Sequence, residues 1–244
     1  MKKLRAPNGC PWDRKQTPQS ITPFLLEETH EVIECVDNHD WDGLKEELGD
    51  LLLHVVFQSV MACEAERFTL EQVLSGINEK LIRRHPHIFG KAEVADEHEV
   101  RKNWESIKMA EGKKEGRLDG VPKALPSLTR SARLQSKAAS VGFDWHKIED
   151  VKAKIDEEWQ EFHEAVEQGE FDQMEEEFGD LLFSLVNLAR WMKIDPEKAL
   201  RRTIEKFIMR FRAIEEELKQ RGKKPENSTL EEMDSIWEQV KKQL

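Results

Sequence analysis

Two short groups of carboxylates are the residues in this chain best suited to chemistry. Glu158 and Glu161 are three positions apart, as are Glu177 and Asp180. Side chains at this spacing lie on one face of a helix. The second pair leads into the apolar run 181–186, and a carboxylate beside a buried helix is costly unless a positive charge neutralises it. A divalent cation bound by oxygen atoms from two facing helices would supply that charge.

A solvated acidic helix face is the alternative interpretation, because the chain contains 49 Asp and Glu residues. The acidic pattern, however, occurs twice. The same residue types stand 130 positions earlier, at Glu28, Glu31, Glu47 and Asp50. A duplicated pattern in fixed register favours a site over a solvated face. We therefore predict that the repeated clusters bind metal.

The composition limits the kinds of partner and compartment. The chain has 244 residues and a net charge of −11, which disfavours nucleic acid or an anionic membrane as the main partner. It has no apolar run long enough to cross a membrane and no apolar signal core at its N-terminus. The three cysteines show no metal-binding spacing and are expected to be reduced thiols, as in a cytoplasmic protein.

Hydrophobic periodicity and capping residues predict an all-α protein made of two tandem helical-bundle repeats. Residues 1–16 are expected to be irregular, and the turn between the first two helices is placed at 40–43. Glycines and prolines between 112 and 126 indicate a linker. The predicted domains are residues 1–111 and 127–244. Helices are expected at 22–38, 44–65, 69–85, 97–111, 128–141, 148–168, 172–193 and 197–221, with a last one capped by Thr229.

A second repeated feature is a basic pair at helical spacing. Lys206 and Arg210 are four positions apart, and Lys80 and Arg84 occupy the matching place in the first repeat. A lysine and an arginine on one helix face can bind a polyphosphate, the first as a point charge and the second as a fork. A surface pair that contacts neighbouring glutamates is an equally good interpretation of these residues alone.

A repeated tryptophan and lysine follow each basic pair. Trp237 precedes Lys241 by four positions, as Trp104 precedes Lys108. On one helix face the ring could stack on a nucleobase of any type while the lysine contacts a phosphate. The alternative is that the tryptophan anchors the last helix of its repeat to the core.

Several motifs together resemble one known family. They are the two acidic patterns, the segments CPWD at 10–13 and RHPHIFG at 84–90, and VGFDW at 141–145. Over nearly the whole chain this set resembles the two-domain bacterial form of the MazG family of nucleoside triphosphate pyrophosphohydrolases. The resemblance implies magnesium-dependent conversion of a nucleoside triphosphate and water into a monophosphate and diphosphate, with loose base preference. It also implies helical domains that form a homodimer, and catalysis by the C-terminal domain.

The resemblance also implies roles for individual residues. The expected Mg²⁺ ligands and catalytic carboxylates are Glu158, Glu161, Glu177 and Asp180, with Glu157 as a candidate to orient water or act as base. The expected substrate-binding residues are Lys154, Glu158, Glu176, Asp180, Lys206, Arg210, Trp237 and Lys241. A second and inactive site is expected at Glu28, Glu31, Glu47, Asp50, Lys80, Arg84, Trp104 and Lys108. The competing hypothesis is a non-catalytic helical interaction module with acidic docking faces.

Overall fold

The computed structural model describes residues 1–97, 99–100, 103–104, 107, 111 and 116–243. Every regular element within these residues is a helix, which confirms the all-α class. The chain divides into two compact units, Met1–Gly112 and Lys113–Leu244, which we describe separately. In the described part of the chain, none of the helices has the length and apolar character needed to span a bilayer.

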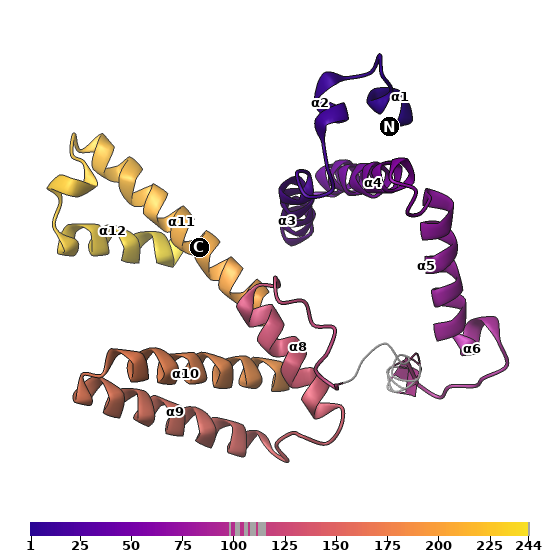
Figure 1. The fold of residues 1–244 in the computed structure, drawn as a ribbon. Coiled ribbons are helices and arrows are strands. Elements are labelled where there is room, and N and C mark those ends of the chain that lie inside the picture. Colours follow the sequence, from indigo (N-terminus) through magenta and orange to yellow (C-terminus); the bar gives the residue numbers. More distant parts are fainter. Residues whose placement is uncertain (98, 101–102, 105–106, 108–110, 112–115, 244) are drawn as a thin grey trace. The chain divides into compact units, whose positions relative to one another are not determined.

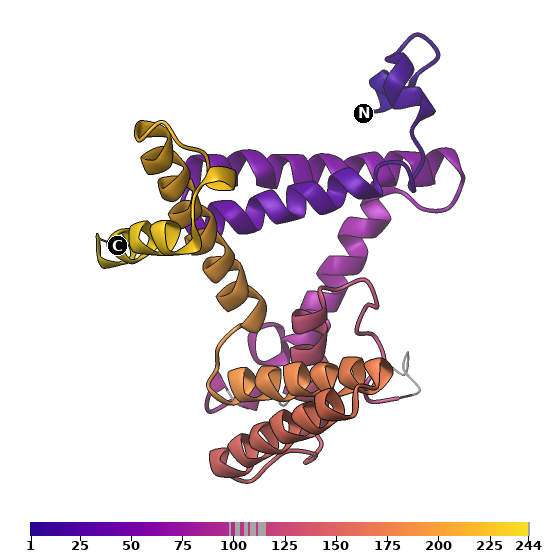
Figure 2. The same ribbon diagram turned by 90° about the vertical axis from the view of Figure 1, so that its left-hand side faces the viewer.

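The first unit is organised around an antiparallel helix pair. Helices α3 (Thr22–Asn38) and α4 (Trp41–Glu64) run side by side (Figure 2). The expected turn at 40–43 is shorter than predicted, because Asp40 accepts a hydrogen bond from the Gly43 amide at 3.0 Å and so starts α4 at Trp41. His39 adopts the left-handed conformation that closes α3. The sequence-based expectation of a longer loop was therefore wrong.

The N-terminal segment contains two short helices where irregular chain was expected, α1 (Lys2–Arg5) and α2 (Pro11–Lys15). Arg5 fixes this segment to the end of α4. Its guanidinium donates to Glu64 from Nε at 2.9 Å and Nη2 at 2.7 Å, and lies 5.5 Å from the ring centre of Phe57. Phe57 in turn belongs to a small core with Ile21 and Met61.

Two further helices complete the described first unit. Helix α5 (Leu70–Arg84) begins with the predicted capping box between Thr69 and Gln72. Pro86 opens the short α6 (Pro86–Phe89). The helix expected at 97–111 falls largely outside the described residues. Residues 116–126 of the expected linker form turns without a helix.

The second unit is built on the corresponding helix pair. Helices α9 (Ile148–Gln168) and α10 (Phe171–Trp191) pack antiparallel along their lengths (Figure 1). Gly169, with φ of 74°, ends α9 in the left-handed region that glycine adopts without strain. Helix α8 (Ser127–Ala139) packs on α10, where Gln135 Nε2 donates to the carbonyl of Phe183 at 2.8 Å.

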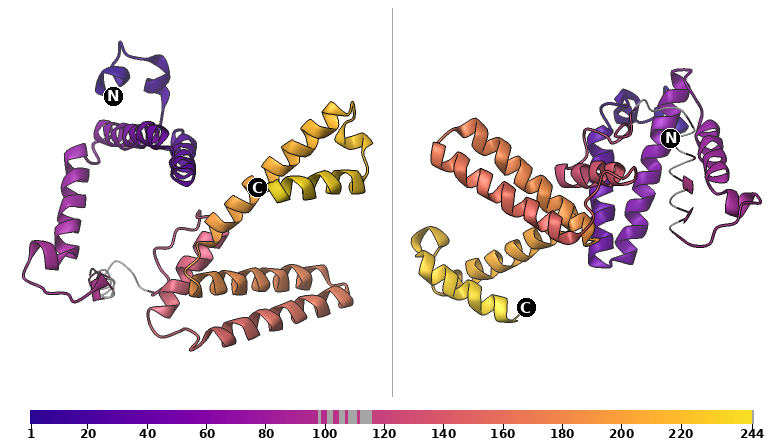
Figure 3. Two further views of the ribbon diagram at one scale, coloured as in Figure 1. Left: turned by 180° about the vertical axis from the view of Figure 1, so that it is seen from behind. Right: turned by 90° about the horizontal axis from the view of Figure 1, so that it is seen from below.

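The C-terminal helices of the second unit form a separate pair. Helix α11 (Pro196–Gln220) begins at the predicted Asp195 cap and leads away from α9 and α10. After a short 3₁₀ turn (Pro225–Asn227), α12 (Leu230–Gln243) folds back along α11 (Figure 3). Ile214, Leu218 and Ile236 form the core between these two helices.

Candidate metal centre

The helix pair of the second unit brings three of the predicted ligands together. Glu158 and Glu161 project from α9, and Glu177 projects from α10. Their ligand oxygens all lie within 4.8 Å of one another. Glu158 is buried with 7% of its surface exposed, whereas Glu177 is half-buried and Glu161 is exposed. The fourth predicted ligand, Asp180, lies one helical turn beyond Glu177 and lines the adjoining cavity.

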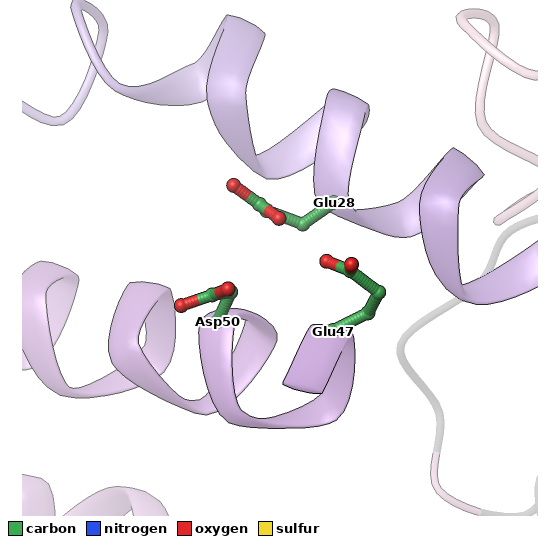
Figure 4. A group of neighbouring side chains, drawn as sticks. All are labelled: Glu28, Glu47 and Asp50. Carbon is green, nitrogen blue, oxygen red and sulfur yellow. The ribbon is translucent and has the colours of Figure 1, made fainter. Parts of the chain in front are cut away.

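The first unit brings a different set of three carboxylates together. Glu28 on α3 points across to Glu47 and Asp50 on α4 (Figure 4), again with ligand oxygens within 4.8 Å of one another. Glu31 is not part of this close group. It still acts on the group electrostatically, because its side chain hydrogen-bonds to Glu28 and its charge raises the pKa of Glu47.

Both clusters bring several carboxylates close together. Burial and the neighbouring carboxylates Glu161, Asp180 and Glu158 raise the pKa of Glu177. Burial, a hydrogen bond to Glu31 and the charge of Asp50 raise the pKa of Glu28 to about 7. Oxygen atoms converging from two helices, at a distance where they repel one another, are the donor set that a hard divalent cation such as Mg²⁺ prefers. The residues present therefore fit that ion.

A lysine distinguishes the second cluster from the first. Lys154 Nζ lies 2.7 Å from Glu157 and 2.9 Å from Glu158, and these hydrogen bonds raise its pKa. The residue 130 positions earlier is Phe24. The first cluster thus has no lysine at this position, although its carboxylates match by type. This difference between the repeats, Phe24 against Lys154, is visible in the sequence.

The second cluster also opens onto a large cavity. The cavity has a volume of about 590 Å³, and Lys154, Glu158 and Asp180 line its polar side. The rest of the wall is mainly apolar and comes from α8, α9, α10, the loop between α8 and α9, and the segment before α8. Its apolar residues include Leu118, Leu134, Phe143, Trp145, Val151 and Phe183.

A salt bridge holds the loop wall of this cavity in place. The Asp144 carboxylate accepts hydrogen bonds from Arg190 Nη1 at 3.0 Å and Nη2 at 2.5 Å, and from Trp191 Nε1 at 3.1 Å. The loop is therefore tied to the last turn of α10. We did not predict Asp144 or Arg190 as site residues, because residues 46 positions apart carry no pairing signal in the sequence.

The pocket beside the first cluster is smaller and polar. It has a volume of about 190 Å³, and its walls come from the end of α3 and the start of α4. Its lining residues are Glu31, Glu34, Cys35, Asn38, Asp40 and Glu47. The two clusters are thus similar in their carboxylates and differ in the space beside them. Of these two pockets, the one in the second unit has the larger apolar surface for a flat ring.

The predicted basic and aromatic residues lie on other helices of each unit. The Arg210 guanidinium carbon is 5.2 Å from the ring centre of Trp237, and that of Arg84 is 5.4 Å from Trp104. Trp237 also packs against the core between α11 and α12. The other predicted residues in the described regions, Lys80, Glu176, Lys206 and Lys241, are exposed.

The basic and aromatic residues of α11 and α12 are not brought to the metal cluster of the second unit. Helix α12 packs against α11, and no comparable packing joins α12 to α9 or α10 in the described part of the unit (Figure 1). Lys241 is paired instead with Glu238 at 3.0 Å. Lys108 lies outside the described residues, so its predicted role has no structural counterpart here.

The acidic cluster of the first unit predicts an unusual pH dependence of stability. The folded-state pKa of Glu28 is about 7, above its ordinary value of 4.5, so the folded chain binds the extra proton between these values. The stabilisation is therefore present at about pH 4.5 and lost as the pH rises through about 7. Without divalent cations, the thermal midpoint should fall by a few degrees between about pH 5 and about pH 8. The Glu28→Gln variant should show a smaller fall, and an identical fall would contradict the assignment.

Comparison with known proteins places the chain in a family. The MazG nucleotide pyrophosphohydrolase domain matches residues 16–89 and 146–214, one segment in each unit. The chain therefore belongs to the MazG nucleotide pyrophosphohydrolase family. It is 47% identical over 243 residues to the nucleoside triphosphate pyrophosphohydrolase/pyrophosphatase MazG of Thermotoga maritima, covering 99% of this chain and 92% of that protein. It is 43% identical to the nucleoside triphosphate pyrophosphohydrolase of Escherichia coli K12, covering 100% of this chain and 95% of that protein.

Proposed function

We propose that this protein is a magnesium-dependent nucleoside triphosphate pyrophosphohydrolase with broad base specificity. The observation that carries the proposal is the carboxylate cluster of Glu158, Glu161 and Glu177, of which Glu158 also lines a cavity of about 590 Å³. The names of the relatives in Thermotoga maritima and Escherichia coli support the same reaction class. The second unit is the proposed catalytic unit, because its cluster adjoins the larger and more apolar cavity.

The proposed reaction breaks the bond between the α-phosphorus and the oxygen that bridges to the β-phosphorus. A water oxygen forms the new bond to the α-phosphorus, and diphosphate leaves with the bridging oxygen. Glu158, Glu161 and Glu177 would hold Mg²⁺, which would neutralise charge on the phosphates and lower the pKa of the attacking water. Glu157 is the candidate to accept the proton of that water. Lys154, between Glu157 and Glu158, would bind a phosphate oxygen.

The walls of the cavity support loose base preference. Phe143 has 81% of its surface exposed and Trp145 is also exposed, so both rings are accessible to a ligand in the cavity. Stacking on aromatic rings tolerates any nucleobase, because every base has a π-face. Discrimination between bases needs hydrogen bonds to their edges, whereas the apolar part of the wall, with Leu134, Phe143 and Trp145, would contact a base through its face. We therefore propose that the base binds in this cavity.

We further propose a homodimer in which each site is completed by the partner subunit. Lys206, Arg210 and Trp237 lie on α11 and α12, which lead away from the cluster of their own chain. Helix α10 leaves large apolar residues exposed at Phe178, Leu182, Phe183 and Leu185. A twofold partner could cover this surface and supply the basic residues to the site.

The expected partners and compartment follow from charge and cysteine chemistry. The net charge of −11 does not favour nucleic acid as a ligand, whereas a nucleotide that arrives with magnesium carries less net negative charge. Cys10, Cys35 and Cys63 are all free thiols, and Cys63 is exposed. Free thiols suit a reducing compartment. We propose that the protein works in the cytoplasm.

A product assay tests the proposed reaction. Purified protein with excess Mg²⁺ and each of the eight common nucleoside triphosphates should release diphosphate and monophosphate in equal amounts. Chelation of the metal should stop the release, and rates should differ by no more than about tenfold between bases, which corresponds to about 1.4 kcal/mol. If folded protein releases no diphosphate from any of them, the chain is better explained as a non-catalytic interaction module.

A further inference from the structure

Each unit contains an arginine whose guanidinium lies over a tryptophan ring. In the first unit this pair is Arg84 and Trp104, and in the second unit it is Arg210 and Trp237. The two guanidinium carbons lie 5.4 Å and 5.2 Å from the respective ring centres. A cation–π contact of this kind restrains the guanidinium and leaves its N–H groups available to an anion. The two units differ in what these N–H groups meet.

In the first unit the arginine edge is occupied by a carboxylate from the same chain. Glu111 Oε2 accepts from Arg84 Nη2 at 2.5 Å, and Glu111 Oε1 accepts from Arg84 Nε at 3.1 Å. Only 11% of the Arg84 side chain and 19% of the Glu111 side chain are exposed. Arg83 adds a further contact to Glu111 Oε1 at 2.7 Å. Hydrogen bonds from Arg84 and Arg83 lower the pKa of Glu111 to about 2, so it stays ionised at neutral pH.

In the second unit, one N–H of the corresponding guanidinium has no acceptor among the described residues. Arg210 Nε is buried and makes no hydrogen bond within the described part of the chain. A buried guanidinium N–H without an acceptor is costly, which points to an anionic ligand at this position. The acceptor in the first unit is local in sequence, because Glu111 follows Trp104 by seven positions.

We propose that Glu111 is an internal substitute for a phosphate group that blocks Arg84, and that Arg210 is left open to bind the triphosphate. A carboxylate and a phosphate bind the same fork of a guanidinium through two parallel hydrogen bonds, so they compete for it. The inference rests on the proposed function, in which the Lys–Arg pairs bind the triphosphate. The first unit is then expected to bind triphosphate weakly, although its acidic, basic and aromatic residues match those of the second unit.

Anion binding to the full chain tests this proposal without using catalysis. The starting protein carries Arg210→Gln, which removes the open arginine of the second unit. Titration calorimetry with inorganic tripolyphosphate then measures binding before and after Glu111→Gln is added. We expect Glu111→Gln to tighten tripolyphosphate binding by about tenfold or more, because charged hydrogen bonds of this kind contribute about that much. The glutamine keeps the size of the side chain and releases the guanidinium.

Two further variants identify the cause of any gain. Glu79→Gln removes one negative charge from an exposed position of the same helix as Arg84 and should leave tripolyphosphate binding unchanged. Arg84→Ala added to Glu111→Gln should abolish the gain. Circular dichroism checks that every variant is folded. No gain with Glu111→Gln, an equal gain with Glu79→Gln, or a gain that persists without Arg84 would each overturn the proposal. Failure of the diphosphate assay would instead reject the proposed reaction and leave this measurement unaffected.

Discussion

Alanine at both Glu158 and Glu161 is expected to reduce diphosphate release by more than about 100-fold. These residues supply two of the three carboxylates that converge beside the large cavity. Loss of an outer-shell partner alone typically costs a metal site 10–100-fold in affinity or activity, so loss of two direct ligands should cost more. Steady-state rates over a Mg²⁺ titration measure the effect, since a higher metal concentration should not restore the rate.

The matched variant carries alanine at Glu28 and Glu31 and should retain at least about half of the activity. The pocket beside the first cluster is small and polar, and the first repeat has Phe24 where the second has Lys154. A misplacement of about 1 Å already costs on the order of 100-fold in rate, so matching carboxylates alone do not make a working site. Equal loss of activity in both double variants, with both still folded, would show that the chain carries two working sites.

Mixing two inactive variants should restore about a quarter of the wild-type activity. One variant carries Glu177→Ala on α10, and the other carries Arg210→Ala on α11. If each site combines α10 of one subunit with α11 of its partner, random exchange makes about half of the dimers mixed. Each mixed dimer then has one site with both residues intact and one site with neither.

The exchange experiment separates this arrangement from a site within one chain. Each variant alone should show only background activity, and co-expression with two different affinity tags allows the mixed dimers to be isolated. Light scattering should give the mass of a dimer for every preparation. If purified mixed dimers are as inactive as either variant alone, the two residues act within one subunit, or Arg210 does not bind substrate.

The sequence predicted the helix pairs and the position of the acidic clusters because both depend on local patterns. Capping residues such as Thr69 and Asp195 predicted where helices begin. The repeated acidic pattern predicted that Glu28 and Glu47 lie on facing helices. The sequence did not predict which carboxylates converge in each unit. Glu161 joins the second cluster and Asp50 joins the first, because side-chain conformations depend on neighbours such as Lys154, which is bound to Glu158.

The large cavity could not be predicted for a different reason. Its walls come from α8, α9, α10 and a loop, and these segments meet through contacts between residues far apart in the chain. Gln135 and Phe183, for example, are 48 positions apart and belong to no shared periodic pattern. Hydrophobic periodicity reports that a face is buried and gives no information on which segment covers it.

The salt bridge that holds the cavity loop and the carboxylates of the metal cluster respond differently to acid. Burial opposes ionisation of Asp144, but its hydrogen bonds to Arg190 and Trp191 outweigh this and lower its pKa below the ordinary value of 3.8. The pKa of Glu177 moves the other way, above its ordinary value of 4.5. On acidification, Glu177 therefore takes up a proton while Asp144 is still ionised and holds the loop against α10. Mild acid should weaken metal binding through Glu177 and leave the cavity loop in place, so that a return to neutral buffer should reverse the change.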